Sequence, residues 1–257
     1  MTRKFIDLSV SLEEGIKSDP EFMLPKINYH HHADTADEIV SFFPGLSKAD
    51  LPGGEGWAME TITVNTHNGT HMDAPYHYHS TMNNGERAIT IDEVPLEWCF
   101  NPGIKLDLRS YDDGYVLTAN DIKSELKKIN YVLKPLDIVL VNTSAGGRYG
   151  MDDFLSKGCG IGKEATLYLL EQGIRLTGTD AWSWDAPFIH TAKKFKESND
   201  ASLIWEGHRA GMVQGYSHIE KLTNLESIPN QGFTISAFPF KIKKGSAGFV
   251  RVVAIID

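Results

Sequence analysis

Cysteine is scarce in this sequence, and that scarcity limits both its stabilisation and its chemistry. Among 257 residues there are only two cysteines, Cys99 and Cys159. Two cysteines cannot build the disulfide framework of a small secreted domain, so a reducing, cytoplasmic compartment is expected. Neither cysteine lies in a recognisable activation motif, so neither is expected to serve as a nucleophile.

The chain also lacks the marks of membrane and nucleic-acid-binding proteins. No stretch approaches the roughly 20 apolar residues that a membrane span needs, and the first residues, Met1–Lys4, include no apolar signal region. The formal net charge of -9 opposes binding to phosphate backbones. With 41% hydrophobic and 23% charged residues, the chain is expected to form a single globular domain, residues 1–257.

Histidine is concentrated in one short segment, His67–His77, whose sequence is HNGTHMDAPYH. A helix would place the first two histidines on one face. However, the Asn-Gly-Thr between them forms helices poorly, and Pro75 disfavours helix at the residue before it. The preceding residues, Met59–Thr66, alternate and are rich in β-branched residues (threonine, isoleucine and valine), which predicts a strand.

Four side chains of this segment carry the predicted chemistry. We expect His67 at the end of the strand and a tight loop that turns His71 and Asp73 back toward it. Two imidazoles and one carboxylate at this spacing suit a divalent first-row metal such as zinc or manganese. His77 lies outside this set and is available to transfer protons.

The pattern His67-x-Gly-Thr-His71-x-Asp73-Ala-Pro-x-His77 closely resembles the signature of the metal-dependent cyclase-like hydrolase family. That family includes bacterial kynurenine formamidases and isatin hydrolases. The resemblance extends to the first strand, to the GTDAWSWD segment and to the C-terminal tail. It implies an α/β fold with a mixed central β-sheet and flanking helices, of the swivelling β/β/α type, usually in a homo-oligomer (dimer or tetramer).

The resemblance also implies a second metal position. In the family, a downstream histidine and a glutamate twelve residues later complete it, and His208 and Glu220 have that spacing. His67, His71 and Asp73 would hold one ion, and Asp73, His208 and Glu220 the other, with Asp73 bridging the two. Two divalent ions per chain, zinc or manganese, are therefore expected.

Other polar residues have open roles. His218 precedes that glutamate by two residues on a predicted strand, so it would share its face as a ligand or as the partner of a ligand. Asp180, Ser183 and Asp185 follow a predicted strand and either approach the pocket or cap their own loop. The run His30–His32 suggests metal binding, but neighbouring side chains cannot all face one ion, and at most one is expected to line the pocket.

Apolar patterning predicts the remaining regular elements. A helix is expected from Thr118 to Ile129, with Asp121 in a capping-box position, and another over Gly162–Gln172, ended by Gly173. Strands are expected at Phe5–Leu12, Ile104–Leu108, Leu136–Val141, Ile174–Gly178, Gly232–Lys241 and Phe249–Ile256.

Two segments depart from the family pattern. Glu13–Gly56 contains four prolines and is expected to be a long loop or lid over the pocket. Its Phe42 and Phe43, with Trp57, would form aromatic walls or pack the lid onto the body. Phe188–Asn199 is lysine-rich, resembles an insertion, and is expected to be a solvated loop.

Together these features predict a metal-dependent hydrolase that uses metal-activated water on a small formamide, cyclic amide or lactone, with His77 as general base. The specific hypothesis is an arylformamidase that hydrolyses N-formylkynurenine in tryptophan catabolism. An isatin- or dienelactone-type ring opening is the alternative. Two other classes stay open: a non-haem iron oxygenase, because His67, His71 and Asp73 match its ligand types, and a catalytically idle metal-binding protein.

Overall fold

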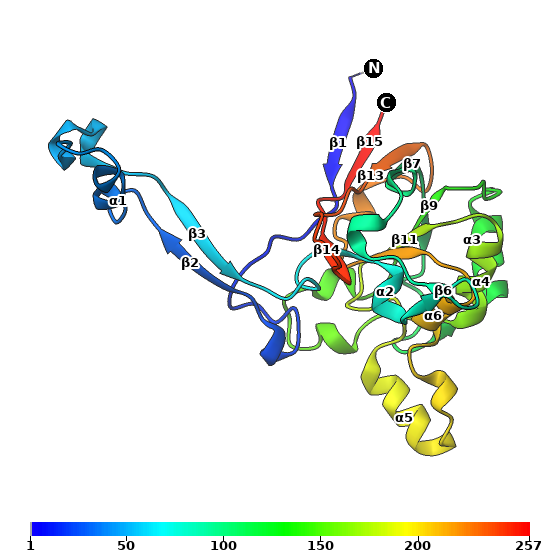
Figure 1. Ribbon diagram of the computed structural model, residues 1–257. Helices are drawn as coiled ribbons and strands as arrows, with labels where there is room; N and C mark the ends of the chain where they lie inside the picture. The colour runs from blue at the N-terminus through cyan, green and yellow to red at the C-terminus, as the bar shows by residue number, and fades with distance from the viewer. Residues whose placement is uncertain (1) are drawn as a thin grey trace.

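A nine-stranded mixed sheet forms the centre of the computed structural model, which describes residues 2–257 (Figure 1). The strand order is β1-β15-β13-β7-β9-β11-β12-β4-β14. Neighbours among β7, β9, β11 and β12 run parallel, and all other neighbours in this sheet run antiparallel. The strands are β1 (Lys4–Asp7), β4 (His71–Asp73), β7 (Phe100–Asp107), β9 (Ile138–Asn142), β11 (Leu176–Thr179), β12 (Ser217–Glu220), β13 (Phe233–Ser236), β14 (Ala247–Phe249) and β15 (Val253–Ile256).

Six α-helices accompany the sheet in the described residues, and the expected mixed α/β fold is confirmed. They are α1 (Ala36–Ser41), α2 (Pro75–Tyr78), α3 (Ala119–Lys128), α4 (Lys163–Glu171), α5 (Phe188–Ser198) and α6 (Glu206–Arg209). The capping box predicted for α3 is present, since Thr118 and Asp121 bond each other's backbone N–H groups. Among residues 2–257, every helix is too short or too polar to cross a membrane.

The core lies on both faces of the parallel strands. In β9, Ile138 and Leu140 join the cluster on one face, while Val139 and Val141 pack with α3 and α4 on the other. Side chains alternate between the faces of a strand, so a strand covered on both sides is apolar throughout. This explains why the aliphatic patterns predicted β9 and β11 close to their observed positions.

Three two-stranded sheets lie outside the central sheet. They are β2 (Lys26–His30) with β3 (Met59–Thr63), β5 (Thr81–Met82) with β6 (Glu86–Arg87), and β8 (Val116–Leu117) with β10 (Gly160–Ile161). The hairpin β2–β3 and everything between its strands, residues 26–63, is called the arm below. It extends far from the body, with α1 at its tip (Figure 1).

The arm corrects the prediction for Glu13–Gly56. This segment is not irregular throughout, because it contains β2 and α1. Phe42 and Trp57 pack on each other at the tip, with ring centroids 5.9 Å apart, rather than on the body. The run His30–His32 also lies on the arm and does not line the pocket that holds the predicted site.

Two further predictions about regular structure were wrong. The expected loop Phe188–Asn199 forms α5, in which Phe188, Ala192 and Phe195 recur at helical spacing and line an apolar cavity. The single strand expected over Phe249–Ile256 is two strands: β14 pairs with β4 at one edge of the sheet, and β15 lies between β1 and β13 near the other. The break falls at Val250–Val252, where neither glycine nor proline marks it, so no local signal predicts it.

Candidate metal and catalytic site

Two neighbouring strands bring four side chains to one face of the sheet. In the antiparallel pair β4–β12, Asp73 is opposite His218, and His71 is opposite Glu220. Residues two apart on a strand share a face, while the intervening Met72 is fully buried in the core. The sequence prediction of a tight loop at His71 and Asp73 was therefore wrong, because both residues belong to β4.

Each strand imidazole lies between the two carboxylates. The Nε2 atom of His218 is 3.2 Å from Asp73 Oδ2 and 3.2 Å from Glu220 Oε1. The Nε2 atom of His71 is 3.4 Å from Asp73 Oδ1 and 3.5 Å from Glu220 Oε2. All four side chains are buried, so their charges interact in a medium of low polarity.

Three more histidines reach this centre from loops and short helices. His67 lies in the turn after the arm, with Nδ1 2.9 Å from Asp73 Oδ1. His77 lies on α2, with Nε2 3.7 Å from Asp73 Oδ2. His208 lies on α6, with Nε2 3.9 Å from Asp73 Oδ2 and 3.7 Å from Glu220 Oε1. The structure thus brings together all six predicted site residues and adds His218.

The second ring nitrogen of several histidines has its own partner. The Nδ1 atom of His71 is 3.0 Å from the carbonyl oxygen of Gly69, and the Nδ1 atom of His208 is 2.5 Å from Asp185 Oδ2. The Nδ1 atom of His218 is 3.1 Å from the Tyr78 hydroxyl. Such contacts fix the orientation of a histidine ring and leave its other nitrogen free to bind a metal ion.

Several buried polar atoms at this centre lack a hydrogen-bond partner in the described part of the chain, and a bound metal ion would coordinate them instead. His71 Nε2, His218 Nε2 and both carboxylate oxygens of Asp73 are buried and have no hydrogen-bond partner among residues 2–257. Buried polar atoms are nearly always paired, so these require an explanation. Zinc bonds of about 2.1 Å place tetrahedral donors about 3.4 Å apart, which resembles the separations given above.

The donor atoms form two groups that share one aspartate. One group is His67, Asp73 and His77, and the other is Asp73, His208, His218 and Glu220. Imidazole and carboxylate donors of this kind suit zinc, manganese and related divalent ions. The donor set therefore fits the metal chemistry that the sequence predicted. Because His77 belongs to one of these two groups, distance alone does not distinguish it from the expected metal ligands.

The charges at this centre favour a cation. Burial opposes protonation of His71 and His218, but Asp73 and Glu220 outweigh it and raise the pKa of each ring to about 9. Burial also opposes ionisation of Asp73, but the surrounding histidines hold its pKa well below the usual value. At His77 burial prevails and lowers the pKa to about 4, so this ring is neutral at pH 7.

A cavity of about 310 Å³ opens onto the cluster and is lined by His67, His77, His208 and Glu220. Its other walls include three aromatic side chains, Trp182, Phe188 and Trp205, and the remaining lining residues are Asp19, Met23, Asn65, Ser183 and Lys221. Phe42, Phe43 and Trp57, for which the sequence left a place in these walls open, do not line this cavity.

The polar residues of the GTDAWSWD segment differ in what they contribute to the site. Ser183 lines the cavity, and Asp185 accepts hydrogen bonds from the backbone N–H groups of Gly207 and His208. Asp180 is buried elsewhere, where it accepts hydrogen bonds from the backbone and hydroxyl of Thr143, and burial raises its pKa to about 8. Asp185 therefore supports the site, whereas Asp180 is a structural residue.

The two cysteines have no place in this chemistry. Cys99 and Cys159 are both free and buried. Burial raises the pKa of the Cys99 thiol to about 11 and that of Cys159 to about 12. Both thiols therefore stay protonated at neutral pH, and a protonated thiol is a poor nucleophile.

A buried ion pair beside the cavity was missed by the sequence analysis. Lys221 pairs with Asp19 and donates a hydrogen bond of 2.8 Å to the carbonyl oxygen of His67. Asp19 also accepts hydrogen bonds from Asn68 and Trp182. This network ties the loop of His67 to a segment almost fifty residues upstream, a pairing that no local pattern signals.

Known proteins resemble this chain over most of its length. The Cyclase family model, described as "Putative cyclase", matches residues 6–186. A kynurenine formamidase from Erythrobacter litoralis (strain HTCC2594) is 27% identical over 194 residues, which are 75% of this chain and 74% of the relative. A kynurenine formamidase from Bacillus cytotoxicus is 30% identical over 193 residues, 75% of this chain and 77% of the relative.

Solved structures share the fold. Isatin hydrolase A from Ralstonia solanacearum superposes with a TM-score of 0.76 at 20% identity, covering 99% of this chain and 92% of that one. Isatin hydrolase A from Labrenzia aggregata, bound to benzyl benzoate, has a TM-score of 0.73 at 23% identity and covers 99% of this chain and 94% of that one.

Proposed function

The chain belongs to the Cyclase family, and on this premise we propose that it is a metal-dependent hydrolase of a C–N or C–O bond beside a carbonyl group. The observation that carries the proposal is the buried cluster of carboxylates and imidazoles, whose unpaired donor atoms adjoin a ligand-sized cavity. Relatives named kynurenine formamidase and structural neighbours named isatin hydrolase support the same class.

In this proposal, His67, His71 and Asp73 hold one divalent ion, and Asp73, His208 and Glu220 hold a second. His218 joins the second group, because its Nε2 atom is 3.2 Å from a carboxylate oxygen of both Asp73 and Glu220. Zinc and manganese both accept these donors. A bound ion of this kind lowers the pKa of a coordinated water and polarises a substrate carbonyl.

His77 is the proposed general base. Its ring lines the cavity, lies 4.1 Å from the ring of His67 between centroids, and is neutral at pH 7 because burial lowers its pKa. A neutral imidazole at this position accepts a proton from the attacking water and then donates it to the leaving nitrogen or oxygen. Asp73, 3.7 Å from His77 Nε2, stabilises the ring while it carries that proton.

The shape of the cavity favours a small aromatic substrate. A volume of about 310 Å³ is near the lower end of ligand pockets. Trp182, Phe188 and Trp205 offer faces against which a planar ring packs. We propose N-formylkynurenine as the substrate, and therefore an arylformamidase of tryptophan catabolism. A cyclic amide such as isatin, or a dienelactone-type ring, is the second candidate, because a compact planar ring also fits this volume.

Other classes of function explain less of the site. A non-haem iron oxygenase needs two histidines and one carboxylate, which leaves Glu220 and His218 without a role. A catalytically idle metal-binding protein would have a closed site, whereas His67 and His77 face the cavity. The free, buried cysteines support a reducing, cytoplasmic setting as part of the proposal.

The deciding experiment measures hydrolysis of N-formylkynurenine by protein stripped with a chelator, before and after addition of manganese or zinc. We expect turnover to disappear on chelation and to return with metal. Turnover that survives complete removal of metal would contradict the metal-dependent mechanism. Stoichiometric metal binding without turnover would transfer the proposal to isatin or a lactone, which are assayed in parallel. An oxygen requirement would instead support the oxygenase.

A further inference from the structure

A second cavity adjoins the catalytic cavity and shares two of its walls. It has a volume of about 240 Å³, and both Phe188 and Trp205 line the two cavities. We call this second cavity the side pocket. Helix α5, which projects from the body (Figure 1), contributes Ala192 and Phe195 to it, and Ile204 comes from residues 199–205, which lead from α5 to α6.

The side pocket is apolar. Apart from Thr191 and Asp185, the side chains that line it are hydrocarbon or indole groups. Asp185 already accepts hydrogen bonds from the backbone N–H groups of Gly207 and His208. A charged group that enters the side pocket would therefore lose water without gaining a partner. A hydrocarbon group, in contrast, is stabilised when it leaves water for such a site.

The volume of the side pocket limits what it can hold. Benzene fits a cavity of roughly 150 Å³, so a pocket of about 240 Å³ has room for a phenyl or butyl group. Its walls are also incompletely covered, since Phe188 is 48% exposed and Ile204 is 41% exposed. A bound hydrocarbon group would cover part of this apolar surface, which adds to the stabilisation.

Trp205 connects the side pocket to the catalytic residues. Its indole stacks on the ring of His208 with centroids 4.4 Å apart, and it meets the ring of His77 edge to face at 5.0 Å. Its backbone is left-handed, with φ 58° and ψ 38°, and its buried Nε1 atom has no hydrogen-bond partner among residues 2–257. Both features are costly for a bulky residue, and such costs gather at functional sites.

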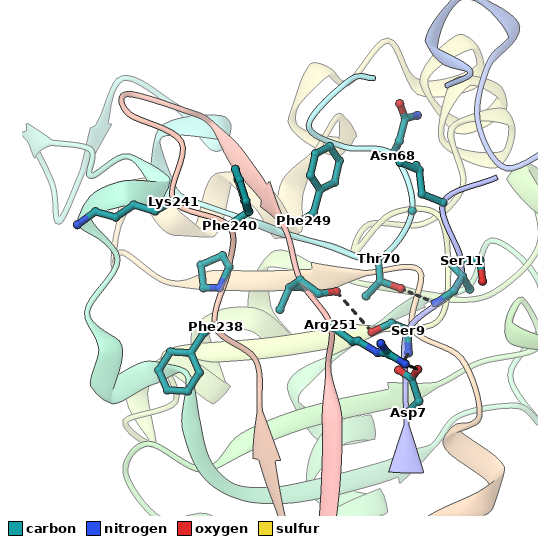
Figure 2. Close-up of a pocket in the computed structure, with 15 residues that line it drawn as sticks. Asp7, Ser9, Ser11, Asn68, Thr70, Phe238, Phe240, Lys241, Phe249 and Arg251 are labelled. Atoms are coloured by element: carbon teal, nitrogen blue, oxygen red, sulfur yellow. Dashed lines mark hydrogen bonds and ion pairs between the residues drawn. The ribbon is translucent and has the colours of Figure 1, made fainter. Parts of the chain in front are cut away.

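A larger groove beside the edge strand β14 lacks this connection (Figure 2). It has a volume of about 860 Å³ and is lined by Phe238, Phe240 and Phe249. Within residues 2–257, no residue lines both this groove and the catalytic cavity. A small substrate in the groove would therefore not reach the donor cluster, and the groove serves as a control surface for the side pocket.

We propose that the side pocket binds an apolar substituent, of about four to six carbon atoms, on the aromatic ring of the substrate. This binding rests on the proposed function, in which the ring occupies the catalytic cavity and the bond to be hydrolysed faces His77. The substituent passes Phe188 and Trp205 into the side pocket. The substrate class is therefore aryl formamides or cyclic amides with a hydrophobic ring substituent. The charged side chain of N-formylkynurenine gains nothing there and has to lie outside the side pocket.

The experiment compares hydrolysis of formanilide with that of its ortho-, meta- and para-butyl derivatives by the metal-loaded, full-length protein. Hydrolysis adds water, breaks the C–N bond and releases formate and the aniline, so one formate assay serves all four compounds. Isatin and butylisatins are assayed in parallel by ring opening. The ratio of kcat/KM for each butyl compound to that of its parent measures the contribution of the side pocket.

Two variants fill the side pocket from different segments. Ala192→Trp adds an indole on α5, and Ile204→Trp adds one in residues 199–205. The matched control is Lys193→Trp, because Lys193 is exposed, follows Ala192 on α5 and lines neither cavity. Circular dichroism verifies that each variant is folded.

Binding of butylbenzene, measured by calorimetry, tests the side pocket without catalysis. We expect a Kd below about 100 µM for the wild type and for Lys193→Trp, and a rise of at least about 10-fold in both filling variants. Phe240→Ala, in the groove beside β14, should bind the probe as the wild type does.

We expect at least one butyl compound to exceed its parent by about 10-fold or more in kcat/KM with the wild type and Lys193→Trp, and this preference to disappear in the filling variants. A wild-type ratio near 1 for every butyl compound overturns the proposal, and so does a filling variant that keeps both the preference and the binding. Loss of butylbenzene binding in Phe240→Ala overturns it too, as does binding that falls with rising protein concentration, which would show that a second copy covers the pocket. If neither series is hydrolysed but both filling variants lose butylbenzene, the proposed function fails and the side pocket is supported.

Discussion

The donors of the site fall into two groups that are held in different ways. His71, Asp73, His218 and Glu220 lie on paired strands, and the backbone register of β4 and β12 sets their mutual distances. His67, His77 and His208 come from a turn and two short helices. The strand group is therefore fixed by the sheet itself, whereas each loop donor depends on particular side-chain contacts.

Three side chains support the loop donors. Asp185 holds His208, Ser246 lies 3.2 Å from Nε2 of His67, and Lys221 bonds the carbonyl oxygen of His67. The strand donors are almost fully buried, whereas the side chains of His67 and His77 keep 16% and 22% of their exposure. We therefore expect single changes in the strand group to have the largest effects and changes in the supports to have graded ones.

Asp73→Asn should have the largest effect, because its carboxylate is shared by both donor groups. Metal chemistry contributes several kcal/mol to catalysis, so loss of the ions should lower kcat/KM by at least about 10³-fold. Atomic emission after desalting measures the bound metal. Glu220→Gln should remove only one of two ions. The exposed Asp112→Asn is the control and should keep both, and wild-type metal content in Asp73→Asn would refute the bridging role.

His77→Ala should lower kcat by about 10²- to 10⁴-fold while metal content stays unchanged, because loss of a general base affects proton transfer only. Burial lowers the pKa of His77 to about 4, so the ring loses its proton as pH rises through 4. Activity that depends on this base should therefore fall below about pH 4. His79→Ala, two residues away and exposed, is the matched control. Loss of metal from His77→Ala would make His77 a ligand instead.

The sequence predicted the donors better than it predicted how they are held. The resemblance identified His67, His71, Asp73, His208 and Glu220, all of which the structure brings to one centre. However, β4 is only three residues long and lies between a turn and Pro75, so it carries no alternation that marks a strand. Its partner β12 lies more than 140 residues further on, and a pairing over that distance leaves no local pattern.

His218 and the arm illustrate the same limit. The period of two correctly placed His218 on the face of Glu220, but only the register of β12 with β4 sets its ring against Asp73. Helices α3 and α4 and strands β9 and β11 were predictable because caps and apolar periodicity are local signals. The aromatic residues Phe42, Phe43 and Trp57 were expected either at the pocket or against the body, because an apolar residue in a sequence does not reveal which surface it will cover.

Asp185→Asn tests a support of the loop group and should weaken metal binding by about 10- to 100-fold, the usual cost of losing a residue that orients a metal-binding histidine. The asparagine keeps an oxygen at Oδ1 for the backbone N–H of Gly207, whereas an amide NH2 replaces Oδ2, which accepts from the backbone N–H of His208 and contacts its Nδ1 atom. Metal titration by calorimetry measures the change, with Asp112→Asn as control. A fall in the melting temperature of the metal-free protein, without a change in affinity, would indicate a purely structural role.

Ser246→Ala should have the smallest effect, because it removes a single hydrogen bond to His67, the most exposed ligand in the proposed set. A net contribution of about 0.5–1.5 kcal/mol corresponds to a 2- to 10-fold loss of metal affinity. The backbone carbonyl of Ser246 still accepts its hydrogen bond from the N–H of Ala74, so β14 should keep its place. Ser246→Thr retains the hydroxyl and should restore wild-type affinity. If Ser246→Ala loses as much metal affinity as Asp185→Asn, the orientation of His67 depends on this one contact rather than on several.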